Sequence, residues 1–123
     1  MIKGKYIYLG CNLYKFVNPH KFDLSEAVSL INVMTGEFAR HRDGIIIDSS
    51  YEADELFLYD SSFKFQVIDN SVTLFCTNPG MQMHYIADCN GVLRIVQGEQ
   101  FSNYLSLFPI LDKEATFVKD SLP

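Results

Sequence analysis

The spacing of hydrophobic and polar residues changes several times along the chain, and each pattern predicts a different element. Short aromatic and β-branched runs at 5–9 and 13–17 predict two strands. Gly10-Cys11-Asn12 between them is typical of a turn, so the two strands are expected to form a hairpin. Ile45-Ile46-Ile47 is apolar at consecutive positions, which predicts a strand near the centre of a sheet with both faces buried.

A helical period is recognisable at 22–42. Asp23 and Glu26 have the spacing of a capping box, whereas Gly36 is expected to weaken the helix by ~1 kcal/mol. A shorter C-terminal helix is expected at 98–109, with one apolar face against the sheet. The buried face of the long helix is expected to carry Leu24, Ala27, Val28, Ile31, Met34 and Phe38.

Two hairpins are predicted in the second half of the chain. Strands at 63–68 and 71–77 flank Asp69-Asn70, two residues that tolerate positive φ. A second pair of strands within 83–96 is joined through Asn90-Gly91, the dipeptide most typical of a tight hairpin turn. Together the two hairpins predict a four-stranded antiparallel meander.

These elements combine into one α+β domain covering 1–123. We expect a mainly antiparallel, curved sheet of about six to eight strands. One long helix lies near the N-terminal third, and a C-terminal helix packs on the sheet. The segment 49–56 is ambiguous, and a short helix or turn followed by a strand at 56–59 is the preferred interpretation.

Composition narrows the class of protein. A hydrophobic content of 48% supplies ample core for 123 residues and argues against disorder. The net charge of −5, with only ten Lys and Arg, argues against nucleic-acid binding, because phosphate contacts need clustered bases. No apolar run approaches the ~18 residues of a membrane span. Three widely spaced cysteines do not form a disulfide framework, so a cytoplasmic location is expected.

Candidate catalytic and metal-binding residues are few. Cys89, His84 and Asp88 can be written as a nucleophile, base and orienting acid, but their order along one strand and turn does not predict hydrogen-bond contact. Cys76, His84 and Cys89 lack the close pairing of zinc ligands, and glycine-rich nucleotide motifs are absent. We therefore expect no enzymatic activity, no metal and no cofactor.

An acidic stretch in mid-chain is the strongest functional signal. Six carboxylates fall within 43–60 without a single Lys or Arg, and aromatic residues are interleaved with them. Such a surface can attract a basic protein and then hold it through aromatic anchors. The expected partner-binding residues are Asp48, Tyr51, Glu52, Asp54, Glu55, Tyr59 and Asp60.

In its small size, acidity and acid-and-aromatic stretch, the chain resembles the immunity proteins of bacterial contact-dependent growth inhibition and related toxin systems. The resemblance implies a protein that neutralises a cognate basic toxin, in some cases a nuclease, by occluding its active site. The acidic side chains would then take the place of nucleic-acid phosphates against the toxin's Lys and Arg.

Two other functions remain open. A small ligand-binding or enzymatic domain would have a pocket between its sheet and helices, with convergent polar groups that include His84. A structural subunit would dimerise through exposed apolar strands that carry residues such as Tyr6 and Tyr8.

Overall fold

The computed structural model describes residues 2–98 and 105–112 and consists mainly of β-strands. One short helix interrupts the strands after the fifth of them. The elements are β1 (Tyr6–Leu9), β2 (Asn12–Val17), β3 (Ser29–Asn32), β4 (Phe38–Arg42), β5 (Ile45–Ser49), α1 (Glu55–Asp60), β6 (Phe63–Ile68), β7 (Ser71–Cys76), β8 (His84–Cys89), β9 (Val92–Gln97) and β10 (Phe108–Pro109).

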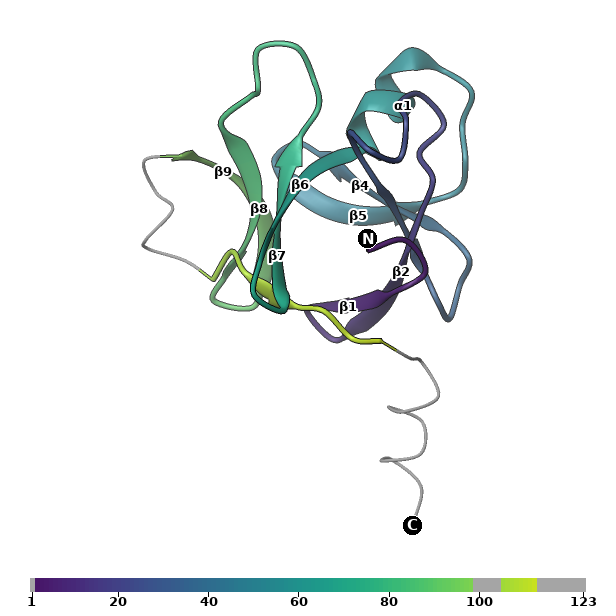
Figure 1. Cartoon of the computed structure of the whole chain (residues 1–123). Coiled ribbons are helices and arrows are strands. Elements are labelled where there is room, and N and C mark those ends of the chain that lie inside the picture. The colour runs from purple at the N-terminus through teal and green to yellow at the C-terminus, as the bar shows by residue number, and fades with distance from the viewer. Residues whose placement is uncertain (1, 99–104, 113–123) are drawn as a thin grey trace.

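The ten strands of the described chain form a single antiparallel sheet that curls into a barrel-like shape (Figure 1). Their order is β1-β2-β3-β4-β5-β9-β8-β7-β10, with β6 paired to β7 beside this path. The two ends of the order meet where the backbones of Tyr6 and Leu111 exchange hydrogen bonds of 2.9 and 2.7 Å. This contact removes most of the open edge that the first and last strands would otherwise present.

The core fills the space inside the curled sheet. Strand residues alternate between the two faces, so every second side chain of a strand can point inward. Buried members of this core are Ile2, Ile7, Leu9, Tyr14, Phe16, Val28, Leu30, Ala39, Phe63, Val72, Leu74, Ile86 and Phe108.

The fold corrects the predicted α+β class, because the long helix at 22–42 is not present. The capping-box spacing produces one turn, closed by Ala27 N–H donating to Asp23 O at 3.1 Å. After it come β3 and β4, joined by a tight turn in which Asn32 Oδ1 accepts from Met34 N at 2.9 Å. Gly36 has φ +75°, which suits this turn and not a helix. The apolar spacing that fits a helical face here also fits two strands with a turn between them.

The predicted C-terminal helix at 98–109 is also wrong in its described part. The described part of the expected helix at 98–109 is extended, since Phe108 pairs with Val72 of β7, and residues 99–104 lie outside the described chain. The helix near mid-chain is α1, and it includes the segment 56–59 that was predicted as a strand. Six residues make up α1, and no helix in the described ranges is long and apolar enough to cross a membrane.

Several predicted strands are confirmed. The sheet of the described chain has ten strands, whereas six to eight were expected. The N-terminal hairpin and the meander β6-β7-β8-β9 are formed, with positive φ at Asp69 (55°) and Asn90 (56°) in the meander's turns. The strand β5 is present but is not buried on both faces, because Ile47 is 40% exposed. Ile47 lies opposite Arg40 of β4, and among the strands α1 packs mainly against β4.

Candidate functional site

A run of seven exposed residues, 50–56, leads from β5 into α1. Residues 20–22 lie against this segment and against α1, as their ring and charge contacts show. We call residues 50–61 together with 20–22 the α1 cap. It contains six of the seven residues that the sequence predicted to bind a partner.

Ring contacts hold the exposed segment in place. Tyr51 is 47% exposed, yet its ring lies 4.3 Å from that of His20 and 5.6 Å from that of Phe57. Phe38 of β4 also contacts the rings of His20 and Phe57, at 5.5 and 5.9 Å. Aromatic pairs at these separations add ~0.5–1.5 kcal/mol each beyond the area they bury. The Tyr51 ring is therefore both exposed and fixed.

Asp54 begins α1 as its N-cap. Its carboxylate accepts from Phe57 N at 2.9 Å, and its backbone carbonyl accepts from Leu58 N at 3.2 Å. Such a cap contributes ~1 kcal/mol to a helix. At the other end, Ser61 donates through Oγ to Phe57 O at 2.7 Å. Both ends of a six-residue helix that would not form alone are thus closed by hydrogen bonds.

A buried ion pair fixes α1 to the sheet. Arg40 of β4 is 3% exposed and donates to Asp60 at 3.1 Å, with its guanidinium 5.0 Å from the Phe57 ring. Asp60 also accepts from Asn78 Nδ2 at 2.8 Å and lies 3.5 Å from His41 Nε2. The carboxylate therefore has partners from two separate segments of the chain, β4 and the loop after β7.

Two exposed carboxylates of the α1 cap also have cationic partners. Glu52 accepts from Arg40 at 3.1 Å, and Glu55 accepts from Lys21 at 3.3 Å. Lys21 lies at the same time 4.7 Å from the centre of the Tyr59 ring. Surface pairs of this kind contribute little to stability, but they lower the net negative charge of the surface.

Asp48 lies apart from the α1 cap. It accepts from Tyr14 Oη at 2.6 Å and from Asn32 Nδ2 at 2.8 Å, and so connects β5 to β2 and β3. Burial and the neighbouring Asp48 carboxylate raise the pKa of the Tyr14 hydroxyl. The Asp48 carboxylate is therefore committed to contacts within the fold.

The expected acidic surface is thus only partly assembled. Tyr51, Glu52, Asp54 and Glu55 are exposed, whereas Asp60 points into the protein. No local pattern indicated that Lys21 and Arg40 would meet these acids, since both cations precede the acidic stretch in the chain. The contacts reduce the free charge on which the toxin-inhibitor hypothesis depends, and that hypothesis remains a prediction.

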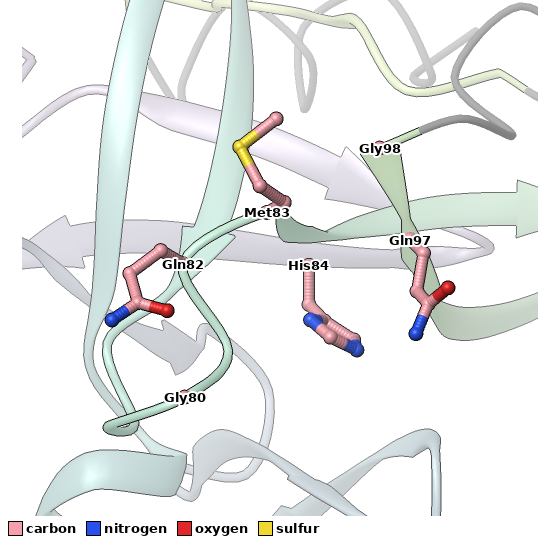
Figure 2. Close-up of a pocket in the computed structure, with 6 residues that line it drawn as sticks. All are labelled: Gly80, Gln82, Met83, His84, Gln97 and Gly98. Carbon is pink, nitrogen blue, oxygen red and sulfur yellow. The ribbon is translucent and has the colours of Figure 1, made fainter.

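A pocket of about 220 Å³ lies at the start of β8. His84 and Gln97 are directly opposite in the β8–β9 pairing, and Gln82 comes from the loop before β8. Figure 2 shows the His84 ring between the side chains of Gln82 and Gln97. Nδ1 of His84 is buried and has no hydrogen-bond partner among the described residues. We call this the His84 pocket; its lining residues are Gly80, Gln82, Met83, His84, Gln97 and Gly98.

The cysteines are not brought together with a base. Cys76 is 2% exposed, and burial, with a smaller effect of Asp60, raises the pKa of its thiol to about 12. Cys89 Sγ lies 4.0 Å from Ala87 O, and no hydrogen bond joins it to His84 in the described chain. Within the described residues, no group of three His, Cys, Asp or Glu side chains is arranged to hold a metal ion.

Comparisons with known proteins bear on the fold. No protein-family model matches the chain, and no curated protein matches it. Among solved structures, the chain is similar to the GH43 β-1,3-galactosidase, with a TM-score of 0.60 and 12% sequence identity. The match covers 80% of this chain and 20% of that chain, so this chain corresponds to about a fifth of the hydrolase. At this identity the similarity concerns the fold alone.

Proposed function

We propose that the chain is a non-catalytic binding protein and that a basic partner protein docks on the α1 cap. The observation that carries the proposal is the combination of exposure and order in residues 50–56. All seven residues are exposed, while ring contacts of Tyr51, the ion pair of Glu52 and the helix cap of Asp54 fix the segment. A surface already ordered before binding loses less conformational entropy when a partner docks.

Affinity is expected to come mainly from the aromatic part of the surface. Tyr51 and Leu56 are 47% and 59% exposed and flank Glu52, Asp54 and Glu55 in the sequence. Tyrosine is enriched among the residues that contribute most to protein interfaces, where truncation typically costs ~2 kcal/mol or more. Tyr51 is therefore the expected anchor.

Charge favours a basic partner. Within the α1 cap and its ion pairs, the carboxylates of 52, 54, 55 and 60 face two cations, Lys21 and Arg40, and the whole chain carries a net charge of −5. Most of these carboxylates are already paired with Lys21 or Arg40. The negative electrostatic field of the protein is therefore expected to accelerate association with a basic partner more than it strengthens the complex. A toxin inhibitor is the finer form of the proposal, with Asp54 and Glu55 meeting Lys and Arg at the toxin's active site.

The test begins with a photo-crosslinking amino acid at position 51 and, as a matched control, at Val67. Val67 is similarly exposed at 45% but lies on β6. Crosslinking is carried out in extracts of the native cell and with the protein encoded beside this chain. The proposal expects a basic protein that crosslinks at 51 and not at 67. Equal crosslinking at both positions would contradict it.

The identified complex then separates aromatic from electrostatic contributions. Tyr51→Ala is expected to weaken binding about 30-fold, mainly through faster dissociation. Asp54→Asn with Glu55→Gln removes two charges while keeping a side chain that can cap α1, so it should slow association a few-fold at low salt. If the partner is a toxin, co-expression should restore growth with the unmodified chain and fail to do so with Tyr51→Ala.

A further inference from the structure

The His84 pocket shares no lining residue with the α1 cap, although the loop that forms its wall also contacts the cap, where Asn78 Nδ2 donates to Asp60 at 2.8 Å. In Figure 1, β8 and β9 lie on the opposite side of the barrel from α1. The pocket wall is built by ordered backbone: Met81 N donates to Asn78 O at 3.0 Å, and His84 N donates to Met81 O at 3.0 Å. Gly80 has φ +83°, as a turn at this position requires.

The polar side chains of the pocket have unused hydrogen-bonding capacity. Nδ1 of His84 is buried without a partner, and the carboxamides of Gln82 and Gln97 make no hydrogen bond to any described residue. A buried polar atom without a partner costs free energy that a bound ligand can recover. The His84 ring lies between the side chains of Gln82 and Gln97, which are exposed and whose carboxamides both donate and accept hydrogen bonds (Figure 2).

Size and charge limit the ligand. The volume of about 220 Å³ equals that of about seven water molecules at liquid density, which is the scale of one sugar ring. None of the described lining residues is charged, so an ionic ligand would find no counter-ion among them. Carboxamides and an imidazole pair well with hydroxyl groups, because each hydroxyl both donates and accepts.

Gly98 closes one side of the pocket and leaves room beside it for the exposed side chain of Met83. Six of the seven glycines have positive φ, but Gly98 does not, so its backbone conformation does not require glycine. A Cβ at Gly98 would lie 3.1 Å from the terminal methyl of Met83. A larger side chain at this position would therefore press on Met83 and fill the pocket.

We propose that the His84 pocket is a binding site for a small, uncharged, hydroxyl-bearing ligand, about as large as one monosaccharide. His84, Gln82 and Gln97 donate to and accept from its hydroxyl groups. A ligand of this size with a few hydrogen bonds is expected to bind with a dissociation constant on the order of millimolar.

The test is a titration of the ¹⁵N-labelled full chain with glucose, followed by NMR. The side-chain amide signals of Gln82 and Gln97 are expected to shift together. Glucuronate and glucosamine serve as ring-matched probes that add a negative or a positive charge. Both are expected to bind at least about tenfold more weakly, because the pocket offers no counter-ion.

Two variants address the pocket by different means. His84→Phe removes the imidazole, and Gly98→Leu fills the space without touching a hydrogen-bonding group. Each should weaken binding about tenfold or more, whereas His20→Phe, a histidine of the α1 cap, should leave it unchanged. If one pocket variant fails to fold, the other still decides the question.

The proposal is overturned by any of three results. The first is an absence of amide shifts at glucose concentrations up to about 100 mM, far above the expected dissociation constant. The second is equally tight binding of either charged probe. The third is unchanged glucose binding by a folded Gly98→Leu variant.

Discussion

Removing the Asp60 carboxylate is expected to destabilise the protein far more than removing that of Glu52, although both pair with Arg40. Asp60 and Arg40 are 7% and 3% exposed as side chains, whereas Glu52 is 51% exposed. In Asp60→Ala the guanidinium stays buried without its buried counter-charge, and Asn78 loses the acceptor 2.8 Å from its Nδ2. Breaking a buried pair from one side costs about 3–5 kcal/mol, against at most about 1 kcal/mol for an exposed pair.

Urea unfolding measures the difference. With a slope of about 1.5 kcal/mol per molar urea, Asp60→Ala should lower the midpoint by about 2–3 M and Glu52→Ala by less than about 0.7 M. Asp60→Asn keeps one acceptor and loses the charge, so it should fall between the two and provides a folded variant if Asp60→Ala is too unstable.

A paired replacement tests whether the cost comes from the stranded charge. Arg40→Met combined with Asp60→Leu removes both charges and should recover much of the stability lost in Asp60→Ala. Equal midpoints for Asp60→Ala and Glu52→Ala, or no recovery in the paired variant, would refute the view that a buried ion pair anchors α1.

Three further predictions concern single groups. Asp54→Ala should lower the free energy of unfolding by about 1 kcal/mol, and Asp54→Asn should lower it by only a few tenths. Urea titration of both variants measures the difference, and equal losses would contradict the role of Asp54 as the N-cap of α1. The pKa of the Cys76 thiol rises from 9.0 to about 12 on folding, so the unfolded chain loses this proton at a lower pH than the folded chain does. The free energy of unfolding should therefore be unaffected below pH 9. Above pH 9 it should decline by up to about 1.4 kcal/mol per pH unit. Cys76→Ala should flatten that decline between pH 9 and 10, and an unchanged slope would exclude the thiol as its source. A thiol reagent should modify the exposed Cys11 at once and Cys76 only on unfolding, and rapid modification of Cys76 in the native protein would show that the core opens there.

Short-range signals predicted the hairpins well. Asp69-Asn70 and Asn90-Gly91 occupy turns whose backbone requires positive φ, and these residue types favour that conformation wherever they occur. Such predictions need only a few neighbouring residues, and for that reason they were confirmed.

The helix predicted from the spacing of apolar residues was wrong, because the same spacing fits two different structures. The apolar positions between Ala27 and Phe38 satisfy a helical face, but they also satisfy two strands if the chain turns between them. Asn32 and Gly36 stabilise the turn. The Asn32 side chain accepts hydrogen bonds from the turn backbone, and Gly36 adopts the positive φ that the turn requires. The hydrogen bonds between Leu111 and Tyr6, which are 105 residues apart, close the barrel and so stabilise the strands. A contact between such distant residues cannot be predicted from a local sequence pattern.

The candidate site was predictable in part. Interleaved acids and aromatics predicted a surface segment around Tyr51, and residues 50–56 are exposed, while their binding of a partner stays a prediction. The partners of those acids were not predictable, since Lys21 and Arg40 reach them only through the tertiary fold. Asp48 and Asp60 were expected at the surface, yet hydrogen bonds to buried groups hold them within the fold.

The central claim is that residues 50–56 are exposed and nevertheless ordered. Backbone ¹⁵N relaxation of the free protein tests this most directly, without any partner. The ring contacts of Tyr51 and the ion pair of Glu52 predict order parameters of about 0.8 or higher through the segment, close to those of the strands. Order parameters below about 0.6 at Tyr51 and Glu52 would mean that the surface is not formed before binding, and the account would be contradicted.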